Sequence, residues 1–387
     1  MLESYSLYLH IPFCGHRCSY CDFNTYTTLF DLVQPYAEAL CTEMRQVADA
    51  AGEPLPVHTI FFGGGTPSLM PAAAMKLILE TAASVFALHP QAEITMEANP
   101  GTVDEAYLTA MRQLGVNRLS FGVQSAIGQE LVLLERTHDF ETAVTAVQTA
   151  RQTGFDNLNL DLIYGVPGQT LESWRQSVEA VLALQPEHLS LYCLTIEPGT
   201  PMQRWLRNGR IQPPDPDLAA DQYVLARQLL AKKGYVHYEI SNWAKPGHTC
   251  EHNLTYWRNK PYLGFGAGAH GSAANVRYEI VKQPRVYIRR VQAGGEVLFP
   301  CSTAVARAHT VSREEAISDT IITQLRLLEE GLDLTAFAHR FGQPFATMFS
   351  NELEQLTALG LLKVQNGRLL LTENGRFLSN QVFYRFV

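Results

Sequence analysis

The sequence predicts an α/β protein, a partial (β/α)6 TIM-like barrel followed by a small C-terminal winged-helix-like α+β domain. Six short apolar runs, rich in β-branched and aromatic residues, recur in the first half of the chain, with amphipathic stretches between them. The runs are continuously hydrophobic, as in parallel strands that are covered on both faces. After Glu197 this pattern stops, which marks the end of the repeated βα units. A doubly wound sheet is the alternative arrangement of the same units.

The predicted elements alternate between strand and helix. The strands are Ser6–Ile11, Thr59–Phe62, Glu93–Glu97, Arg118–Val123, Asn157–Ile163 and His188–Leu194. The helices are Pro71–Leu88, Asp104–Leu114, Phe140–Thr153 and Thr170–Leu184. Gly115 and Gly154 stand where left-handed caps would end two of these helices. Units in this order imply right-handed crossovers and a parallel sheet.

The rest of the chain predicts two further parts. We expect the barrel domain to span residues 1–235, a cavity and connector region 236–300, and a C-terminal domain 301–387. In the last part, helices over Arg313–Leu328, Leu334–Phe341 and Phe345–Leu359 precede two short strands and a final helix, which resembles a winged helix. Eight Lys and Arg against nine Asp and Glu give this part a net charge of −1, which argues against nucleic acid as a partner.

Composition favours a cytoplasmic protein. The 387 residues carry a formal net charge of −8, which disfavours nucleic acid and anionic membranes as primary partners. The first residues lack the basic segment of a signal peptide, and no apolar run is long enough to span a bilayer, so we expect no integral membrane segment. Seven cysteines are an odd number, and three of them fall within eight residues, which favours a reducing compartment.

The three clustered cysteines are Cys14, Cys18 and Cys21, in the loop after the first predicted strand. Three thiolates at this spacing can hold three irons of a cubane, which leaves the fourth iron without a protein ligand. An open iron can be chelated by the amino and carboxylate groups of a methionyl moiety. A zinc site with His10 or His16 as the fourth ligand is an alternative. A CxxC redox pair would leave Cys14 unexplained.

Polar or glycine-rich groups stand at the carboxyl ends of the other predicted strands. They are Gly63–Thr66, Glu97, Gln124 and Asp161. In a (β/α) barrel, the carboxyl ends of the strands meet on one face, where ligands bind. The glycine-rich segment is not a phosphate loop, because no lysine follows it.

Several segments together resemble one family. They are LYLHIPFCGHRCSYCDFN, FFGGGTPS, EITMEANPG, RLSFGVQS, NLDLIYGVPGQT, LTIEPGT, HNLTYWRNKPYLGFGAGAHG and, near the end, LLTENGRFLSN. The chain is similar from about Ser6 onward to the oxygen-independent coproporphyrinogen-III-oxidase-like radical S-adenosylmethionine (SAM) family, and in particular to its heme chaperone branch. The resemblance implies a radical SAM barrel with a 4Fe–4S cluster, SAM and heme. It also implies an acceptor protein for the heme, which can be membrane-associated.

The resemblance assigns roles to single residues. Cys14, Cys18 and Cys21 would hold the cluster, and the SAM contacts would be Tyr8, Tyr20, Gly64, Gly65, Thr66, Glu97, Gln124, Arg136 and Asp161. His252, in the HNLTYW segment, would contact heme, since imidazole is a good axial ligand. From the residues alone, Arg136 also fits a helix surface, Glu97 and Asp161 fit caps or core salt bridges, and His252 fits a turn cap.

Two departures separate the chain from the oxidase of this family. The oxidase has a further cysteine two residues after the third ligand, where this chain has Phe23, and it has an N-terminal extension that we expect to be missing here. We therefore favour the chaperone over an enzyme that acts on a tetrapyrrole, such as the oxygen-independent coproporphyrinogen III oxidase. Of the remaining cysteines, we expect Cys41, Cys193 and Cys301 to be core residues, and for Cys250 we favour a buried thiol over a heme neighbour.

Overall fold

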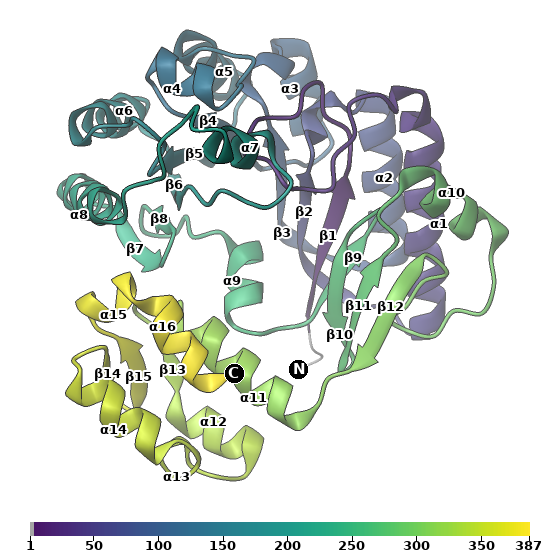
Figure 1. The fold of residues 1–387 in the computed structure, drawn as a ribbon. Coiled ribbons are helices and arrows are strands. Elements are labelled where there is room, and N and C mark those ends of the chain that lie inside the picture. Colours follow the sequence, from purple (N-terminus) through teal and green to yellow (C-terminus); the bar gives the residue numbers. More distant parts are fainter. Residues whose placement is uncertain (1–3) are drawn as a thin grey trace.

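The computed structural model describes residues 4–387, so the first three residues of the predicted barrel domain lie outside it. Its main feature is a twelve-stranded sheet with the order β12-β11-β10-β9-β1-β2-β3-β4-β5-β6-β8-β7 (Figure 1). Six parallel strands occupy the centre: β1 (Tyr5–Ile11), β2 (Pro56–Gly64), β3 (Ala87–Ala98), β4 (Arg118–Gln124), β5 (Leu158–Tyr164) and β6 (His188–Cys193). They follow one another in sequence order, as in a partial (β/α) barrel, whereas a doubly wound sheet reverses direction at a switch point.

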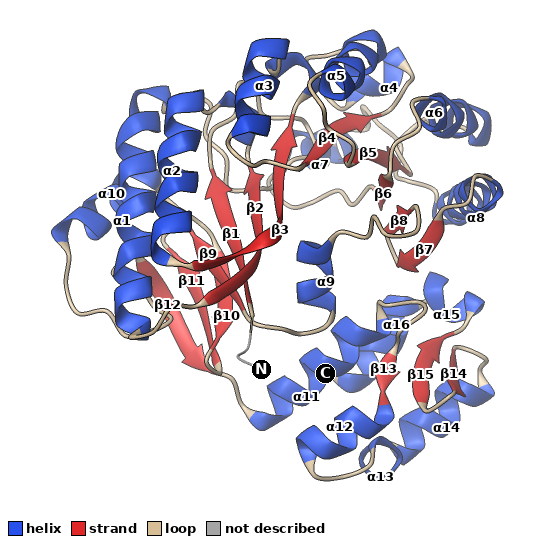
Figure 2. Cartoon of the chain, turned by 180° about the vertical axis from the view of Figure 1, so that it is seen from behind, coloured by secondary structure: helices blue, strands red, loops and turns tan. Residues whose placement is uncertain are grey.

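Helices cover the outer face of these strands (Figure 2). They are α1 (Val33–Ala51), α2 (Ala72–Val85), α3 (Glu105–Gln113), α4 (Gly128–Leu133), α5 (Phe140–Gln152), α6 (Leu171–Ala183) and α8 (Pro216–Lys232). The six predicted strands and four predicted helices are confirmed to within a few residues, apart from two boundaries. Strand β3 begins at Ala87, inside the range predicted as a helix, and β2 extends further at both ends. Helix α1 was not predicted.

Local signals fix where the helices begin and end. Thr170 and Ser173 form a capping box, in which each side chain accepts a hydrogen bond from the backbone N–H of the other at 3.0 Å. Gly115 and Gly154 have φ angles of +98° and +88°, as the predicted caps require.

Residues beyond β6 extend the same sheet at both edges. Strand β9 (Tyr262–Phe265) is parallel to β1, and β10 (His270–Ala273), β11 (Val276–Ile280) and β12 (Val305–Thr310) continue antiparallel beyond it. At the other edge, β8 (Asn242–Ala244) is antiparallel to β6, and β7 (Val236–Glu239) is antiparallel to β8. Three more helices join these elements: α7 (Pro201–Arg207), α9 (Glu251–Trp257) and α10 (Pro284–Ala293). The boundaries at 235 and 300 stay predictions.

The C-terminal region has a core of its own, which includes Ile321, Leu325, Phe337, Phe345 and Leu369. Its elements are α11 (Arg313–Leu325), β13 (Leu332–Asp333), α12 (Leu334–Phe341), α13 (Phe345–Met348), α14 (Ser350–Ala358), β14 (Leu362–Gln365), β15 (Arg368–Leu371), α15 (Glu373–Phe377) and α16 (Ser379–Phe383). The prediction of one helix over Phe345–Leu359 was wrong, because Phe349 leaves the helical conformation and divides α13 from α14. The winged-helix assignment stays a prediction.

Within residues 4–387, no helix combines the length and the apolar character that crossing a bilayer requires.

Candidate functional site at the carboxyl ends of the strands

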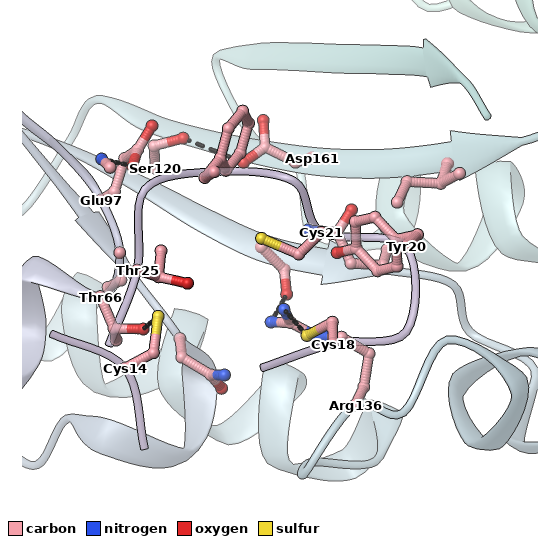
Figure 3. Close-up of a pocket in the computed structure, with 18 of the residues that line it drawn as sticks. Cys14, Cys18, Tyr20, Cys21, Thr25, Thr66, Glu97, Ser120, Arg136 and Asp161 are labelled. Atoms are coloured by element: carbon pink, nitrogen blue, oxygen red, sulfur yellow. Dashed lines mark hydrogen bonds between the residues drawn. The ribbon is translucent and has the colours of Figure 1, made fainter. Parts of the chain in front are cut away.

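A cavity of about 910 Å³ lies at the carboxyl ends of the parallel strands. Its wall includes the loop after β1, which carries Cys14, Cys18 and Cys21, and residues of β2 to β6 (Figure 3). The predicted site residues that line it are Tyr20, Gly64, Gly65, Thr66, Glu97, Gln124, Arg136 and Asp161. The structure thus brings together side chains that are up to about 150 residues apart in the sequence.

Hydrogen bonds hold the cysteine loop in place. The Ser19 hydroxyl donates to the Leu133 carbonyl at 2.8 Å, and the Cys21 N–H donates to the Cys18 carbonyl at 3.2 Å. Two further contacts reach the sulfurs from outside the loop (Figure 3). The Thr66 hydroxyl lies 3.4 Å from the Cys14 sulfur, and Nη1 of Arg136 lies 3.5 Å from the Cys18 sulfur.

The three thiols fit an iron–sulfur cubane by their chemistry and their shared cavity. Among residues 4–387, no three His, Cys, Asp or Glu side chains converge closely enough to hold a single metal ion. A cubane instead takes one thiolate at each of three separate irons. Burial raises the pKa of Cys14 and of Cys21, and iron binding replaces the protons that these thiols would otherwise keep.

The two histidines considered as zinc ligands have other surroundings. Both ring nitrogens of His10 lie within hydrogen-bond distance of other groups, Nδ1 at 3.0 Å from the Tyr8 hydroxyl and Nε2 at 3.0 Å from the Asn24 carbonyl. His16 is largely exposed and faces the Glu135 carboxylate at 3.9 Å.

The glycine-rich turn after β2 requires glycine at two positions. Gly64 has a φ of +109°, and a Cβ there would lie 2.4 Å from the His10 ring. A Cβ on Gly65 would lie 2.6 Å from the Phe13 carbonyl oxygen. The backbone of this turn therefore packs so closely against its surroundings that a side chain at either position would clash.

Two carboxyl groups line the cavity from β3 and β5, on either side of β4. Glu97 accepts a hydrogen bond from the Gly64 N–H at 3.1 Å, and burial, together with the charge of Asp161, raises the pKa of Glu97 to about 8. Burial also raises the pKa of Asp161, although hydrogen bonds from Asn159, Ser190 and Ser120 oppose that rise. This acidic pair suits a ligand that brings a positive charge or hydroxyl donors.

Gln124 and Arg136 leave hydrogen-bonding capacity free beside the cavity. Gln124 has a φ of +71°, which is rare for a residue with a side chain, and its buried Oε1 has no partner. Arg136 donates from Nη2 to the Gly122 carbonyl at 2.7 Å, but its buried Nε has no partner. Such atoms are expected where a ligand completes the structure.

Two predicted site residues, Tyr8 and His252, are not among the residues that line this cavity. Tyr8 packs beside Gly63 and bonds to His10. His252 is 1% exposed, and both ring nitrogens are engaged, Nδ1 at 2.7 Å from the Thr59 hydroxyl and Nε2 at 2.8 Å from the Tyr256 hydroxyl. Burial lowers the pKa of His252 to about 3, so the ring is neutral.

Several lining residues were missed by sequence reasoning: Phe61, Arg118, Ser120, Asn159, Ser190, Tyr192, Cys193 and Asn253. Many of them alternate along β4, β5 and β6, and a period of two within an apolar run is the signal that could have found them. The expectation that Cys193 is a core residue was wrong, because this residue is exposed at the border of the cavity. Cys41 and Cys250 are buried as expected, and Cys301 is half-buried.

Comparison with protein-family models gives two matches. Residues 8–181 match the radical SAM superfamily, and residues 311–378 match the HemN C-terminal domain. The first match covers β1 to α6 and thus most of the cavity, and the second lies within the C-terminal region described above.

Individual relatives are similar over much or all of the chain. Heme chaperone HemW of Bacillus subtilis is 36% identical over 385 residues, which cover 99% of both chains. Heme chaperone HemW of Escherichia coli is 43% identical over 274 residues, which cover 70% of both. Among solved structures, coproporphyrinogen III oxidase (HemN) of E. coli, a radical SAM enzyme, superposes with a TM-score of 0.85 at 26% identity, covering 100% of this chain and 90% of that one.

Proposed function

Because this chain belongs to the HemW family of radical SAM proteins, we propose that it is a heme chaperone that binds heme and passes it to an acceptor protein. We also propose that Cys14, Cys18 and Cys21 hold a 4Fe–4S cluster and that SAM binds beside it. The observation that carries the proposal is the shared cavity, in which the three thiols face the glycine-rich turn and the acidic pair. A cluster with one iron free of protein ligands can chelate SAM and supply an electron to its sulfonium.

The residues around the cavity divide the binding of SAM among them. The backbone of Gly64 and Gly65 and the Thr66 hydroxyl face the methionine part, and Glu97 accepts hydrogen bonds from the ribose. Gln124, Arg136 and Asp161 complete the pocket, where the planar guanidinium of Arg136 suits a carboxylate. Tyr20 closes the side next to the cluster, and Tyr8 supports the turn from behind Gly63.

Heme contact is proposed at the HNLTYW segment, which forms α9. His252 can bind heme iron only after its bonds to Thr59 and Tyr256 break, because both ring nitrogens are occupied in this conformation. Heme titration of His252→Ala tests the assignment, with His58→Ala as the control, since His58 contacts Thr255 of the same helix without belonging to the segment. We expect only His252→Ala to weaken binding and change the Soret spectrum; an unchanged titration removes the assignment.

A second candidate is a radical SAM enzyme that acts on a tetrapyrrole, which the superposition on the oxidase favours. Phe23 argues against it, because this side chain is 63% exposed in the cavity wall where the oxidase has a cysteine. The two functions separate when anaerobically reconstituted protein is incubated with SAM, a reductant and coproporphyrinogen III. Formation of protoporphyrinogen IX would show that the protein is an oxidase.

We propose a cytoplasmic location and an acceptor that can be membrane-associated. All seven cysteines are free thiols, which suits a reducing compartment. Cell fractionation of the tagged chain tests the location. Crosslinking in cells with and without heme tests whether the acceptor is found in the membrane fraction.

A further inference from the structure

Behind Asp161, buried side chains form a chain of hydrogen bonds that leads from the cavity to the start of α9. Nδ2 of Asn159 donates to Oδ1 of Asp161 at 2.8 Å. Oδ1 of Asn159 lies 2.6 Å from Nδ1 of His188, and Nε2 of His188 lies 2.8 Å from the Tyr238 hydroxyl. The backbone N–H of Cys250, the residue before α9, donates to that hydroxyl at 3.4 Å.

The direction of donation in this chain follows from its first member. An ionised Asp161 only accepts hydrogen bonds, so Asn159 turns its nitrogen to Asp161 and its oxygen to His188. His188 must then carry its proton on Nδ1, which leaves Nε2 to accept from the Tyr238 hydroxyl. Burial, with the charges of Arg118 and His248, lowers the pKa of His188 well below its usual value, so the ring is neutral as this arrangement requires.

We propose that His188 and Asn159 are positioning residues for SAM, which hold the Asp161 carboxylate as an acceptor turned toward the cavity. The inference rests on the proposed contact between Asp161 and SAM. Without the His188 N–H, the Asn159 amide can rotate and present its oxygen to Asp161, so that two acceptors face each other. His188 is 0% exposed, so water does not reach the position of its Nδ1, and the Ser190 hydroxyl, which donates to Oδ1 of Asn159 at the longer distance of 3.1 Å, is then the remaining donor to that oxygen among the described residues.

The charged and titratable groups around Asp161 determine how SAM affinity depends on pH. Glu97 faces it from β3, Arg118 from β4 and Tyr192 from β6. Burial raises the pKa of Asp161, and the Asn159 N–H lowers it again. Loss of that donor therefore moves the pKa upward, and SAM binding that needs the carboxylate weakens at a higher pH than in the wild type.

The test measures the SAM dissociation constant of the anaerobically reconstituted full chain between about pH 5.5 and 8.5. We expect His188→Phe to weaken binding about tenfold near neutral pH and to shift the acid limb upward. His188→Asn places an amide nitrogen near the position of Nδ1 and should recover most of the affinity. His237→Phe, at another largely buried histidine of low pKa, is the matched control and should follow the wild type. Glu97 is present in every variant, and because the charge of Asp161 raises its pKa, the shift is read on the titration of the pair and not on Asp161 alone.

The inference is overturned when His188→Phe keeps the wild-type affinity and pH profile. Should His188→Phe not fold, the near-isosteric Asn159→Asp decides in its place, since it replaces the donating nitrogen by an oxygen. Asp161→Asn distinguishes failure of the proposed contact between Asp161 and SAM from failure of the positioning role. Unchanged SAM affinity in Asp161→Asn refutes the SAM contact, and the positioning role falls with it. A loss there, with no effect of the other two substitutions, refutes the positioning role alone.

Discussion

The carboxylate of Glu97 accepts a hydrogen bond at 3.1 Å from the backbone N–H of Gly64, so the end of β3 is joined to the glycine-rich turn after β2. This contact orients a buried carboxyl group whose pKa is raised to about 8, first by burial and then by the charge of Asp161. The same contact fixes the turn whose backbone packs against the cysteine loop. Ligand binding at this point therefore depends on both the protonation of Glu97 and the shape of the turn.

SAM affinity should rise with pH until Glu97 is ionised. Below about pH 8, the carboxyl group must lose a proton before it can accept two ribose hydroxyls, which costs up to about tenfold in affinity per pH unit. Glu97→Gln should bind SAM at least about tenfold more weakly at high pH and show little of this rise. Equilibrium dialysis of reconstituted protein at several pH values checks both points, and a pH-independent wild type would contradict them.

Substitution of Gly64 by alanine should disrupt the turn. The added Cβ would lie 2.4 Å from the His10 ring in a backbone with φ of +109°. We therefore expect the free energy of unfolding to fall by about 3 kcal/mol and SAM binding to be lost. Gly168→Ala is the matched control, since Gly168 also has a positive φ of +82° but no atom within 4 Å of the new Cβ. It should cost only about 1 kcal/mol. Equal losses in denaturant unfolding would show that the contact with His10 is unimportant.

Removal of one cluster thiol should remove the cluster. Cys18→Ala leaves two ligands for the cubane, so we expect the iron and sulfide content and the broad visible absorbance of reconstituted protein to be lost. Cys193→Ser is the control, because Cys193 lines the same cavity from β6. It should retain the full cluster. Iron retained in Cys18→Ala, or lost in Cys193→Ser, would require a different ligand set.

Glu43 should make the fold less stable as pH rises. Its buried carboxyl group accepts hydrogen bonds from Gly266, Tyr287 and Ser302, and burial raises its pKa from 4.5 to about 7. The folded state binds the proton more tightly than the unfolded state. The resulting stability is complete below about pH 4.5 and is lost as pH rises to about 7, a change of roughly 3 kcal/mol.

Glu43→Gln removes this titrating group. Its free energy of unfolding, measured in urea at acidic and at neutral pH, should change less between the two than that of the wild type. Glu38→Gln is the matched control, since Glu38 is exposed on the same helix, α1. The reasoning fails when the wild type and Glu43→Gln lose the same free energy over this range.

The central sheet could be predicted because its parallel strands are buried on both faces, which leaves continuous apolar runs such as Leu158–Tyr164. The outer strands β7, β8 and β10 to β12 could not, because several have only three or four residues and carry no such run. Helix α1 was missed although it is long; Pro35 in its first turn is tolerated there but suggests a break in the sequence.

Part of the site was predicted from single residues that stand out in the sequence. Glu97 and Asp161 stand out as acidic residues in the apolar strands β3 and β5, whereas the neutral side chains of Asn159 and Ser190 resemble ordinary interruptions of such runs. Their role depends on which face of the strand they occupy, and that follows from the register with the neighbouring strands. One hydrogen bond of His252 depends on Thr59, 193 residues away, and no local pattern encodes such a contact.

The exposure of Cys193 makes this thiol a chemical reporter. Cys193 borders the same cavity as Cys14, Cys18 and Cys21, and those three are shielded from alkylation once iron is bound to them. In cluster-loaded protein, the rate at which a maleimide labels Cys193 then reports how far the remaining volume is filled. Occupancy could thus be followed by mass spectrometry without any knowledge of what the occupant is.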